Sequence, residues 1–271
     1  MGHIKGAHGI VWHYELEGEG PSLVFLHGWG VDKRVWRQQS KYFSHNYRVL
    51  TVDLPGHGQS SWEKTNLANM CADLTTMITR LMPGKVTLVA SSLGGLFALK
   101  MYEAMPEKFS RMVMVGSMPR FAQSADFPYG LDVDAMRKLG TQLHTHYPSI
   151  VDVFFRSLFT KQERASRRFK WLQKFRQFED KPIKSALVQY LDILEQEDLR
   201  PVLEKVAVPM HFITGTGDEI CKQEVMEYIR QVQPDARYDS FEECGHFPFL
   251  RKPHEFNAVL EAFLKETEHD T

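Results

Sequence analysis

Residues 86–95 read VTLVASSLGG, and this stretch decides the fold of the chain. The apolar run 86–89 predicts a buried strand, and the residues from Leu93 onward predict a helix that begins almost at once. Ser92 therefore lies at the apex of a tight turn, which lifts its hydroxyl above the edge of a sheet. The backbone of such a turn is crowded, so the residues two positions away must be small, as Ala90 and Gly94 are. This turn predicts a nucleophilic serine.

Strand and helix patterns alternate on both sides of the turn. Expected strands cover residues 10–16, 23–26, 49–52, 86–90 and 112–115, with helices at 66–81 and 93–105. Between residues 131 and 199 only helical periods occur, and from residue 208 the alternation resumes, with strands 210–214 and 236–241 and helices 223–233 and 253–265. Alternation of this kind predicts an α/β protein with a mostly parallel central sheet flanked by helices. We expect a core of residues 1–118 and 206–271, with residues 119–205 inserted as a helical lid.

The composition is that of an ordinary globular protein. The net charge of -1 argues against a dedicated nucleic-acid binder, and no apolar run approaches the roughly 20 residues that span a bilayer. Residues 1–9 lack the apolar core of a signal peptide. Cys71, Cys221 and Cys244 show no paired spacing, so we expect free thiols in a reducing compartment. These observations predict a cytoplasmic protein without a membrane partner, and we expect a monomer.

Two further residues complete the chemistry that a serine nucleophile needs. A serine hydroxyl requires a base within hydrogen-bond reach, and the base requires an acid that orients it. Asp218 follows the strand 210–214, and His246 follows the strand that ends at residue 241. Because the carboxyl ends of parallel strands share one edge of the sheet, we expect both side chains to lie near Ser92. A single Ser, Asp or His in a loop is usually structural, so the prediction depends on their conjunction.

Other residues of the same types meet fewer of these conditions. Ser91 lies one residue from the apex, and Ser117 lacks the flanking glycines. Asp53 begins a turn that its side chain is expected to cap. Glu219, next to Asp218, remains a rival for the acid, and His27 and His57 lie in glycine turns of the first half of the sheet.

Backbone N–H groups are expected to bind the oxyanion of the reaction. The N–H of Leu93, directly after the nucleophile, supplies one donor. The loop HGWG at residues 27–30 follows a strand, and its glycines let the backbone bend toward the site, so the Trp29 N–H supplies the second. The Trp29 ring either walls the acyl pocket or packs in the core.

With these residues in place, the chain resembles the α/β-hydrolase superfamily. The resemblance rests on HGWG at residues 27–30, DLPGHGQS at 53–60, the turn at Ser92, and the pairs Gly217-Asp218 and Gly245-His246. It covers nearly the whole chain outside the inserted helices, and one departure is Ala90, where glycine is commonest. The resemblance implies an α/β-hydrolase fold with a triad of Ser92, Asp218 and His246, in that chain order.

Within the superfamily the chain is similar to the carboxylesterases of biotin synthesis that remove the methyl ester from pimeloyl-acyl carrier protein. The similar stretches are HGWG, VDLPGHGQS at residues 52–60, SSLGGL at 91–96, GSMPRF at 116–121, LDIL at 191–194 and DLR at 198–200. The lid matches loosely, and Ser91 stands where those esterases tend to carry an aromatic residue. By position, the resemblance implies that the acyl chain is contacted by Phe154, Phe155, Arg156, Ser157 and Leu158.

The inserted segment has an uneven charge. Residues 156–184 hold ten basic and three acidic residues, which gives +7 against -8 for the rest of the chain. Such separation favours an anionic partner, and the acidic acyl carrier protein implied by the resemblance would fit it. We expect Arg164, Arg167 and Arg168 to contact it, although a solvated basic face is an equally simple explanation. No nucleic-acid motif accompanies the patch. The apolar residues interleaved with it are spread too widely for one core-facing stripe, and some are expected to line the pocket or an interface: Phe169, Trp171, Leu172, Phe175 and Phe178.

The sequence thus predicts a serine carboxylesterase that acts through an acyl-enzyme, with no metal and no nucleotide cofactor. His144 and His146 are expected to project away from each other on a helix surface. Two alternatives remain open: another hydrolase of this fold, acting on small free esters or on carbon–carbon bonds, and a non-catalytic binding protein. A dehalogenase is disfavoured because it would need Asp in place of Ser92.

Overall fold

The computed structural model describes residues 1–176 and 181–266, with residues 174–176 described by their backbone alone. One sheet forms its centre, and in the described residues it has eight strands in the order β1-β2-β4-β3-β5-β6-β7-β8. β2 runs antiparallel to both its neighbours, and the remaining pairs are parallel. This confirms the predicted α/β class. The strands are β1 Gly2–Lys5, β2 Val11–Glu17, β3 Ser22–Leu26, β4 Arg48–Val52, β5 Val86–Ser91, β6 Phe109–Val115, β7 Met210–Gly215 and β8 Arg237–Phe241.

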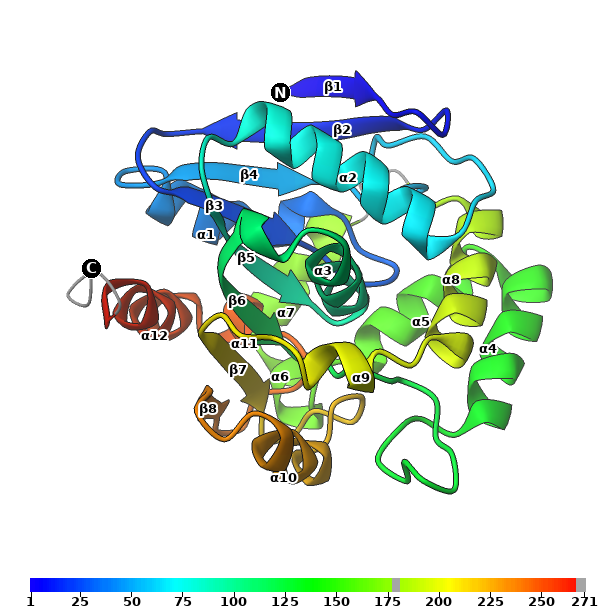
Figure 1. Ribbon diagram of the computed structural model, residues 1–271. Helices are drawn as coiled ribbons and strands as arrows, with labels where there is room; N and C mark the ends of the chain where they lie inside the picture. Colours follow the sequence, from blue (N-terminus) through cyan, green and yellow to red (C-terminus); the bar gives the residue numbers. More distant parts are fainter. Residues whose placement is uncertain (177–180, 267–271) are drawn as a thin grey trace.

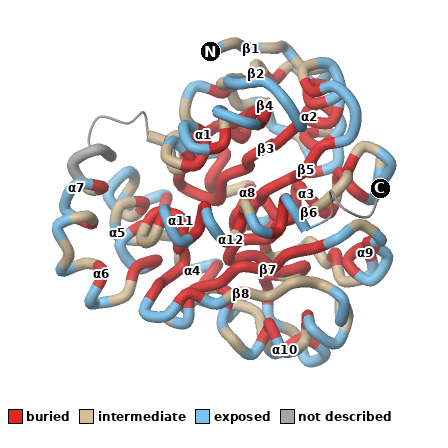
Figure 2. The backbone as a smooth tube through the Cα atoms, turned by 90° about the vertical axis from the view of Figure 1, so that its left-hand side faces the viewer, coloured by how far each residue is buried: buried red, intermediate tan, exposed pale blue. Residues whose placement is uncertain are grey.

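Side chains of the inner strands alternate between two buried faces. In β3, Val24 and Leu26 pack with one core cluster, whereas Leu23 and Phe25 pack with the other. Helices α2 and α3 contribute to the first cluster, and α1 and α12 contribute to the second. Figure 1 shows α2 and α3 in front of the strands, and Figure 2 shows that the tube of the inner strands is almost entirely buried. A sheet covered on both faces explains why these strands are continuous apolar runs.

Local sequence explains where the helices begin and end. α2 begins after Asn66, whose side chain accepts a hydrogen bond from the Asn69 N–H at 2.8 Å. It ends at Leu81, two residues before Pro83, which cannot continue a helix. The helices are α1 Arg37–Phe43, α2 Leu67–Leu81, α3 Leu93–Ala104, α4 Val133–His146, α5 Ser149–Ser157, α6 Lys161–Ala165, α7 Arg167–Arg176, α8 Lys184–Gln196, α9 Arg200–Leu203, α10 Gln223–Val232, α11 Pro248–Arg251 and α12 Pro253–Glu266, with short 3₁₀ helices η1 Lys33–Trp36 and η2 Pro106–Lys108.

Helices α4 to α8 interrupt the alternation between β6 and β7, as the helical periods predicted. α4, α5 and α8 lie at the right of Figure 1, whereas α6 and α7 lie behind the strands. Asp198 closes the base of this insertion through ion pairs with Arg120 and Arg200, each at 2.6 Å. The boundaries 119 and 205 of the lid remain predictions. No helix within residues 1–176 and 181–266 is long and apolar enough to cross a membrane.

Candidate active site

Ser92 lies between β5 and α3 in a backbone conformation that non-glycine residues rarely adopt. Its φ is 53° and its ψ is -122°, a strain that costs on the order of 1–3 kcal/mol and persists only where neighbours enforce it. Here the Ser92 N–H donates to the Val115 carbonyl at 3.0 Å, and the Ser92 carbonyl accepts the Ser117 hydroxyl at 2.8 Å. The turn is therefore held by the end of β6 and the residues that follow it, and the Ser92 side chain is half-buried.

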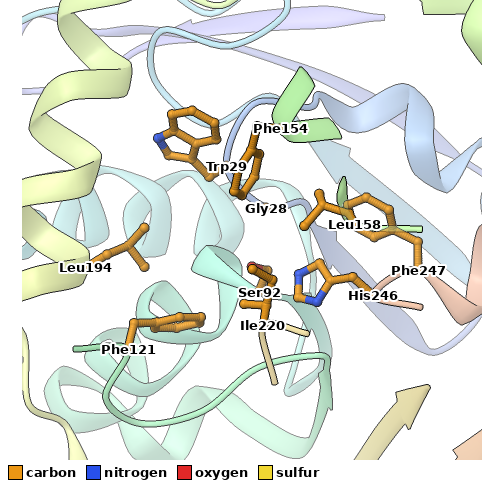
Figure 3. Close-up of a pocket in the computed structure, with 10 residues that line it drawn as sticks. All are labelled: Gly28, Trp29, Ser92, Phe121, Phe154, Leu158, Leu194, Ile220, His246 and Phe247. Carbon is orange, nitrogen blue, oxygen red and sulfur yellow. The ribbon is translucent and has the colours of Figure 1, made fainter. Parts of the chain in front are cut away.

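Asp218 and His246 meet on the loops that follow β7 and β8. Asp218 Oδ2 lies 2.8 Å from His246 Nδ1, and both side chains are almost completely buried. Asp218 Oδ1 accepts the N–H groups of Ile220 and Cys221 at 2.8 and 3.1 Å, which fixes the carboxylate. Because a carboxylate oxygen only accepts, the shared proton belongs to Nδ1 and leaves Nε2 as an acceptor. Figure 3 shows the imidazole beside Ser92.

An apolar pocket surrounds these groups. Its volume is about 30 Å³, which is space for about two water molecules. Figure 3 shows side chains from the core loops and from the lid converging above Ser92. The lining residues are Gly28, Trp29, Ser92, Phe121, Phe154, Leu158, Leu194, Ile220, His246 and Phe247.

The two N–H groups expected to bind an oxyanion lie on fixed backbone. Leu93 is the first residue of α3, where the positive end of the helix dipole adds to the field of its N–H. Among the described residues, neither the Leu93 N–H nor the Trp29 N–H donates a hydrogen bond. Gly28 approaches Ser92 closely, since a Cβ at Gly28 would lie 2.9 Å from the Ser92 Cβ. The loop can therefore reach the turn only with glycine at this position.

Two buried histidines hold the peptide groups on either side of Trp29. His27 Nε2 accepts the Leu54 N–H at 2.9 Å, so its Nδ1 carries the proton and donates to the Gly28 carbonyl at 2.8 Å. That carbonyl belongs to the same peptide unit as the Trp29 N–H. On the other side, the Gly30 N–H donates to His57 Nε2 at 3.1 Å. The direction of the Trp29 N–H is thus fixed by neutral imidazoles.

The Trp29 ring serves both purposes that the sequence left open. Its Nε1 donates to the Leu187 carbonyl of α8 at 3.1 Å, and its ring lies edge-on to Phe154 at 4.8 Å. It is buried and also lines the pocket.

The rival candidates have structural roles or lie elsewhere. Glu219 is exposed. Asp53 accepts the Gln59 N–H at 3.1 Å and so caps its turn, as expected, and it also pairs with Lys33 at 2.6 Å. Ser91 is buried with no hydrogen-bond partner for its hydroxyl among the described residues, and Ser117 supports the Ser92 carbonyl.

The lid contributes fewer residues to the pocket than the resemblance implied. Phe154 and Leu158, one helical turn apart, line it. Phe155 points to the other side of α5, where its ring packs on Phe159 at 5.0 Å. Arg156 and Ser157 lie on the exposed side. Phe155, Arg156 and Ser157 do not line the pocket, because a helix presents only every third or fourth residue to one side. Their contact with the acyl chain stays a prediction.

The basic lid is also more structural than its charge suggested. Arg164 donates to the carbonyls of Arg156 and Phe159, at 3.2 and 2.7 Å, and caps the end of α5. Arg168 Nε donates to the Leu250 carbonyl, and burial, aided by Arg251, lowers the pKa of Arg168. Of the three arginines expected at a partner surface, only Arg167 is exposed, whereas Arg164 and Arg168 are half-buried.

Of the apolar residues that lie between the lid cations in the sequence, some are buried and one is half-exposed. Phe169 and Leu172 are buried against the core, whereas Trp171 keeps 50% of its surface exposed. The described part of the chain excludes the side chains of residues 174–176, among them Phe175, and all of residues 177–180, among them Phe178. The structure therefore does not locate the charged groups of residues 174–180.

Residues 1–176 and 181–266 hold no cluster of three or more His, Cys, Asp or Glu side chains that could bind a metal ion. His144 and His146 are both exposed on α4. Cys71, Cys221 and Cys244 are buried free thiols, as their spacing predicted.

Comparisons with known proteins agree with the fold of this chain. A family model described as alpha/beta hydrolase fold matches residues 21–253. A pimeloyl-[acyl-carrier protein] methyl ester esterase of Nitrosomonas europaea is 32% identical over 250 residues, which are 92% of this chain and 98% of that protein. A protein of the same name from Aliivibrio fischeri is 31% identical over 257 residues, 94% of this chain and 97% of that protein.

Among solved structures, an esterase from Exiguobacterium antarcticum superposes with a TM-score of 0.91 at 28% identity, covering 98% of this chain and all of that one. A bromoperoxidase from Bacillus anthracis has a TM-score of 0.88 at 24% identity with the same coverage, and this likeness concerns the fold alone.

Proposed function

Since this chain belongs to the α/β-hydrolase fold family and is an esterase, we propose that it is a serine carboxylesterase in which Ser92, His246 and Asp218 form the catalytic triad. The observation that carries the proposal is the 2.8 Å contact between Asp218 Oδ2 and His246 Nδ1, buried beside the strained Ser92 turn. A non-catalytic binding protein has no need to store strain at a serine or to orient an imidazole next to it.

The reaction follows from these positions. Ser92 Oγ attacks the ester carbonyl while His246 Nε2 takes its proton, and Asp218 stabilises the imidazolium that forms. The N–H groups of Leu93 and Trp29 bind the oxygen that becomes negative. His246 then protonates the leaving alcohol, and the acyl group remains on Ser92. A water molecule, deprotonated by His246, attacks this acyl-enzyme and releases the acid.

The preferred substrate that we propose is the methyl ester of pimeloyl-acyl carrier protein, the ester named for the relatives. Methanol, the leaving alcohol, is small, and the apolar lining suits a polymethylene chain. A seven-carbon chain needs more space than a cavity of about 30 Å³ offers. Binding therefore requires the lid side chains Phe154, Leu158 and Leu194 to move apart.

The carrier protein would dock on the exposed cations of the lid, which include Arg156, Lys161, Arg167 and Lys170. An acidic carrier is drawn to them by long-range attraction, which acts on the rate of association and weakens with salt. Trp171, next to Lys170 and one helical turn after Arg167 on α7, offers a partly exposed apolar surface.

Turnover of the methyl ester of pimeloyl-acyl carrier protein, compared with that of dimethyl pimelate, tests the substrate. We expect the carrier-linked ester to have a kcat/KM at least about 10-fold higher at low salt, and the advantage to shrink as salt is added. Equal turnover of both would instead favour a hydrolase of small free esters. If neither ester is hydrolysed, the ester specificity proposed here is wrong.

Charge reversal tests the docking surface. Arg167→Glu with Lys170→Glu should lower kcat/KM for the carrier-linked ester by about 10-fold and spare dimethyl pimelate. Arg164 and Arg168 are unsuitable because their guanidinium groups hold main-chain carbonyls. Lys5→Glu with Lys85→Glu is the matched control, because both lysines are exposed and lie outside the lid. An equal effect of the two pairs would contradict docking on the lid.

A further inference from the structure

A short lid segment, residues 158–163, contacts the loop that carries His246. The Leu158 carbonyl accepts the His246 N–H at 2.9 Å. Glu163 Oε2 accepts the Gly245 N–H at 3.0 Å. Two successive peptide groups before the imidazole are therefore held by the lid rather than by the sheet.

The approach of lid and loop is close enough to demand glycine. A Cβ at Gly245 would lie 2.5 Å from the Leu158 carbonyl oxygen and 3.0 Å from Glu163 Oε2. The Thr160 methyl likewise lies 2.6 Å from the place of a Cβ at Gly217, the residue before Asp218. The same lid segment thus touches both loops that carry the proposed acid and base.

One peptide unit connects Glu163 to the Asp218 loop. The unit between Cys244 and Gly245 donates its N–H to Glu163, and its carbonyl accepts the Gly217 N–H at 2.8 Å. The Glu163 carboxylate, this peptide unit and the Gly217 N–H therefore form one chain of hydrogen bonds. It ends beside Asp218 on one loop and beside His246 on the other.

Helix capping alone does not explain why the Glu163 side chain is buried. Thr160 and Glu163 form a capping box at the start of α6, in which Glu163 Oε2 accepts the Thr160 N–H at 2.7 Å. Glu163 is only 1% exposed, and its Oε1 has no hydrogen-bond partner among the described residues. An exposed cap would avoid the desolvation of this carboxylate. The burial instead brings the carboxylate to the Gly245 N–H.

We propose that Glu163 is a positioning residue, which sets the register of the His246 and Asp218 loops by holding the Gly245 N–H. This rests on the proposed triad, because it needs His246 to act on Ser92. Without the carboxylate, the Gly245 N–H is buried unpaired, the loop shifts, and the imidazole no longer meets Ser92 and Asp218 together. A misplacement of this kind lowers kcat more than it changes KM.

The test compares variants of Glu163 with a control in the same capping box. Glu163→Ala removes the acceptor, and Glu163→Gln keeps an amide oxygen that can accept both N–H groups. Thr160→Val removes the hydroxyl that accepts the Glu163 N–H at 3.1 Å, yet it keeps the methyl and leaves the Gly245 contact intact. If Glu163 acted only as a cap, Thr160→Val and Glu163→Ala would have similar effects.

Hydrolysis of p-nitrophenyl acetate and the rate of inactivation by a fluorophosphonate are measured for each variant across pH. We expect Glu163→Ala to lower kcat and the inactivation rate by at least about 10-fold with little change in KM, and to move the acid limb of the kcat/KM profile. Glu163→Gln should recover most of this loss, and Thr160→Val should stay within about 3-fold of wild type.

Three results would overturn the proposal: an unchanged kcat in Glu163→Ala, an equal loss in Thr160→Val, or no recovery in Glu163→Gln. Should Glu163→Ala fail to fold, Glu163→Asp replaces it, because its carboxylate is one methylene too short to reach Gly245 and should also lower kcat. Wild type and Ser92→Ala accompany every assay. If the fluorophosphonate does not inactivate wild type, the proposed triad fails; if it does and the Glu163 variants match wild type, only this inference fails.

Discussion

Two buried histidines, His27 and His57, hold the loop that presents the Trp29 N–H, and their protonation should destabilise the protein in mild acid. Burial lowers the pKa of His27 to about 4. Burial and the neighbouring His27 lower the pKa of His57 to about 3, and they outweigh the opposing effects of the Pro55 carbonyl, Asp32 and Asp53. Each imidazole accepts an N–H at Nε2, a bond that protonation abolishes.

The sign and size of the effect follow from these pKa values. The ordinary pKa is 6.5, so below pH 6.5 the unfolded chain binds more protons than the folded one. The stability that the neutral imidazoles contribute is complete above pH 6.5 and is lost as the pH falls toward the folded pKa. The contribution of each histidine to the free energy of unfolding then falls by about 1.4 kcal/mol per pH unit, or by about 2 kcal/mol between pH 6.5 and 5. For the pair the loss is about 4 kcal/mol, a large part of the roughly 5–15 kcal/mol that stabilises a domain.

Urea unfolding at pH 7, 6 and 5 measures this loss. His57→Gln places an amide oxygen near the position of Nε2, so it keeps an acceptor for the Gly30 N–H and removes one titration. We expect its free energy of unfolding to fall by about 2 kcal/mol less than that of wild type between pH 7 and 5. His254→Gln, at an exposed position on α12, should fall as much as wild type. Equal losses in wild type and His57→Gln would refute the argument that the fold holds His57 neutral.

Three further predictions concern the proposed site. Asp218→Asn should lower kcat on the order of 10³–10⁴-fold, because an amide N–H facing Nδ1 favours the wrong imidazole tautomer; a loss below 10-fold in steady-state assays would contradict the assignment. Gly28→Ala should lower kcat by about 10²-fold at similar KM, since its Cβ meets the Ser92 Cβ at 2.9 Å and displaces the loop; unchanged kcat would show that the loop does not bind the oxyanion. Leu158→Ala should lower the free energy of unfolding by about 2–5 kcal/mol and shift the preference among p-nitrophenyl esters toward longer acyl chains; an unchanged chain-length profile would place the acyl chain elsewhere.

The sequence predicted the centre of the site better than its walls. Ser92, Asp218 and His246 each follow a strand, and the carboxyl ends of parallel strands share an edge, so topology alone brings their loops together. The 2.8 Å contact between Asp218 and His246 agrees with that reasoning. The HGWG loop also follows a strand, and its glycines led to the Trp29 N–H as the second oxyanion donor. That these residues catalyse the reaction is our proposal.

The lid could not be predicted at the same level. Phe154 and Phe155 are adjacent and equally apolar, and only the rotation of α5 decides that the first lines the pocket and the second packs on Phe159. Arg164 and Arg168 look like surface charges in the sequence, yet long side chains can reach back to main-chain carbonyls.

Two smaller features were missed for different reasons. β1 is short and half-exposed, so it carries no apolar pattern. The spacing Thr160-x-x-Glu163 is that of a capping box and could have been recognised. Its contact with Gly245 could not, because residues 163 and 245 are brought together only by the fold.

The most direct test of the account is to locate the site of covalent modification by a fluorophosphonate. Wild type and Ser91→Ala are treated with the probe, digested and mapped by mass spectrometry, with Ser92→Ala as the negative control. Ser91 is the matched control because it is the adjacent serine, buried in β5. We expect one adduct, on Ser92, in wild type and in Ser91→Ala, and none in Ser92→Ala. An adduct on another residue, or equal labelling of Ser92→Ala, would contradict this expectation.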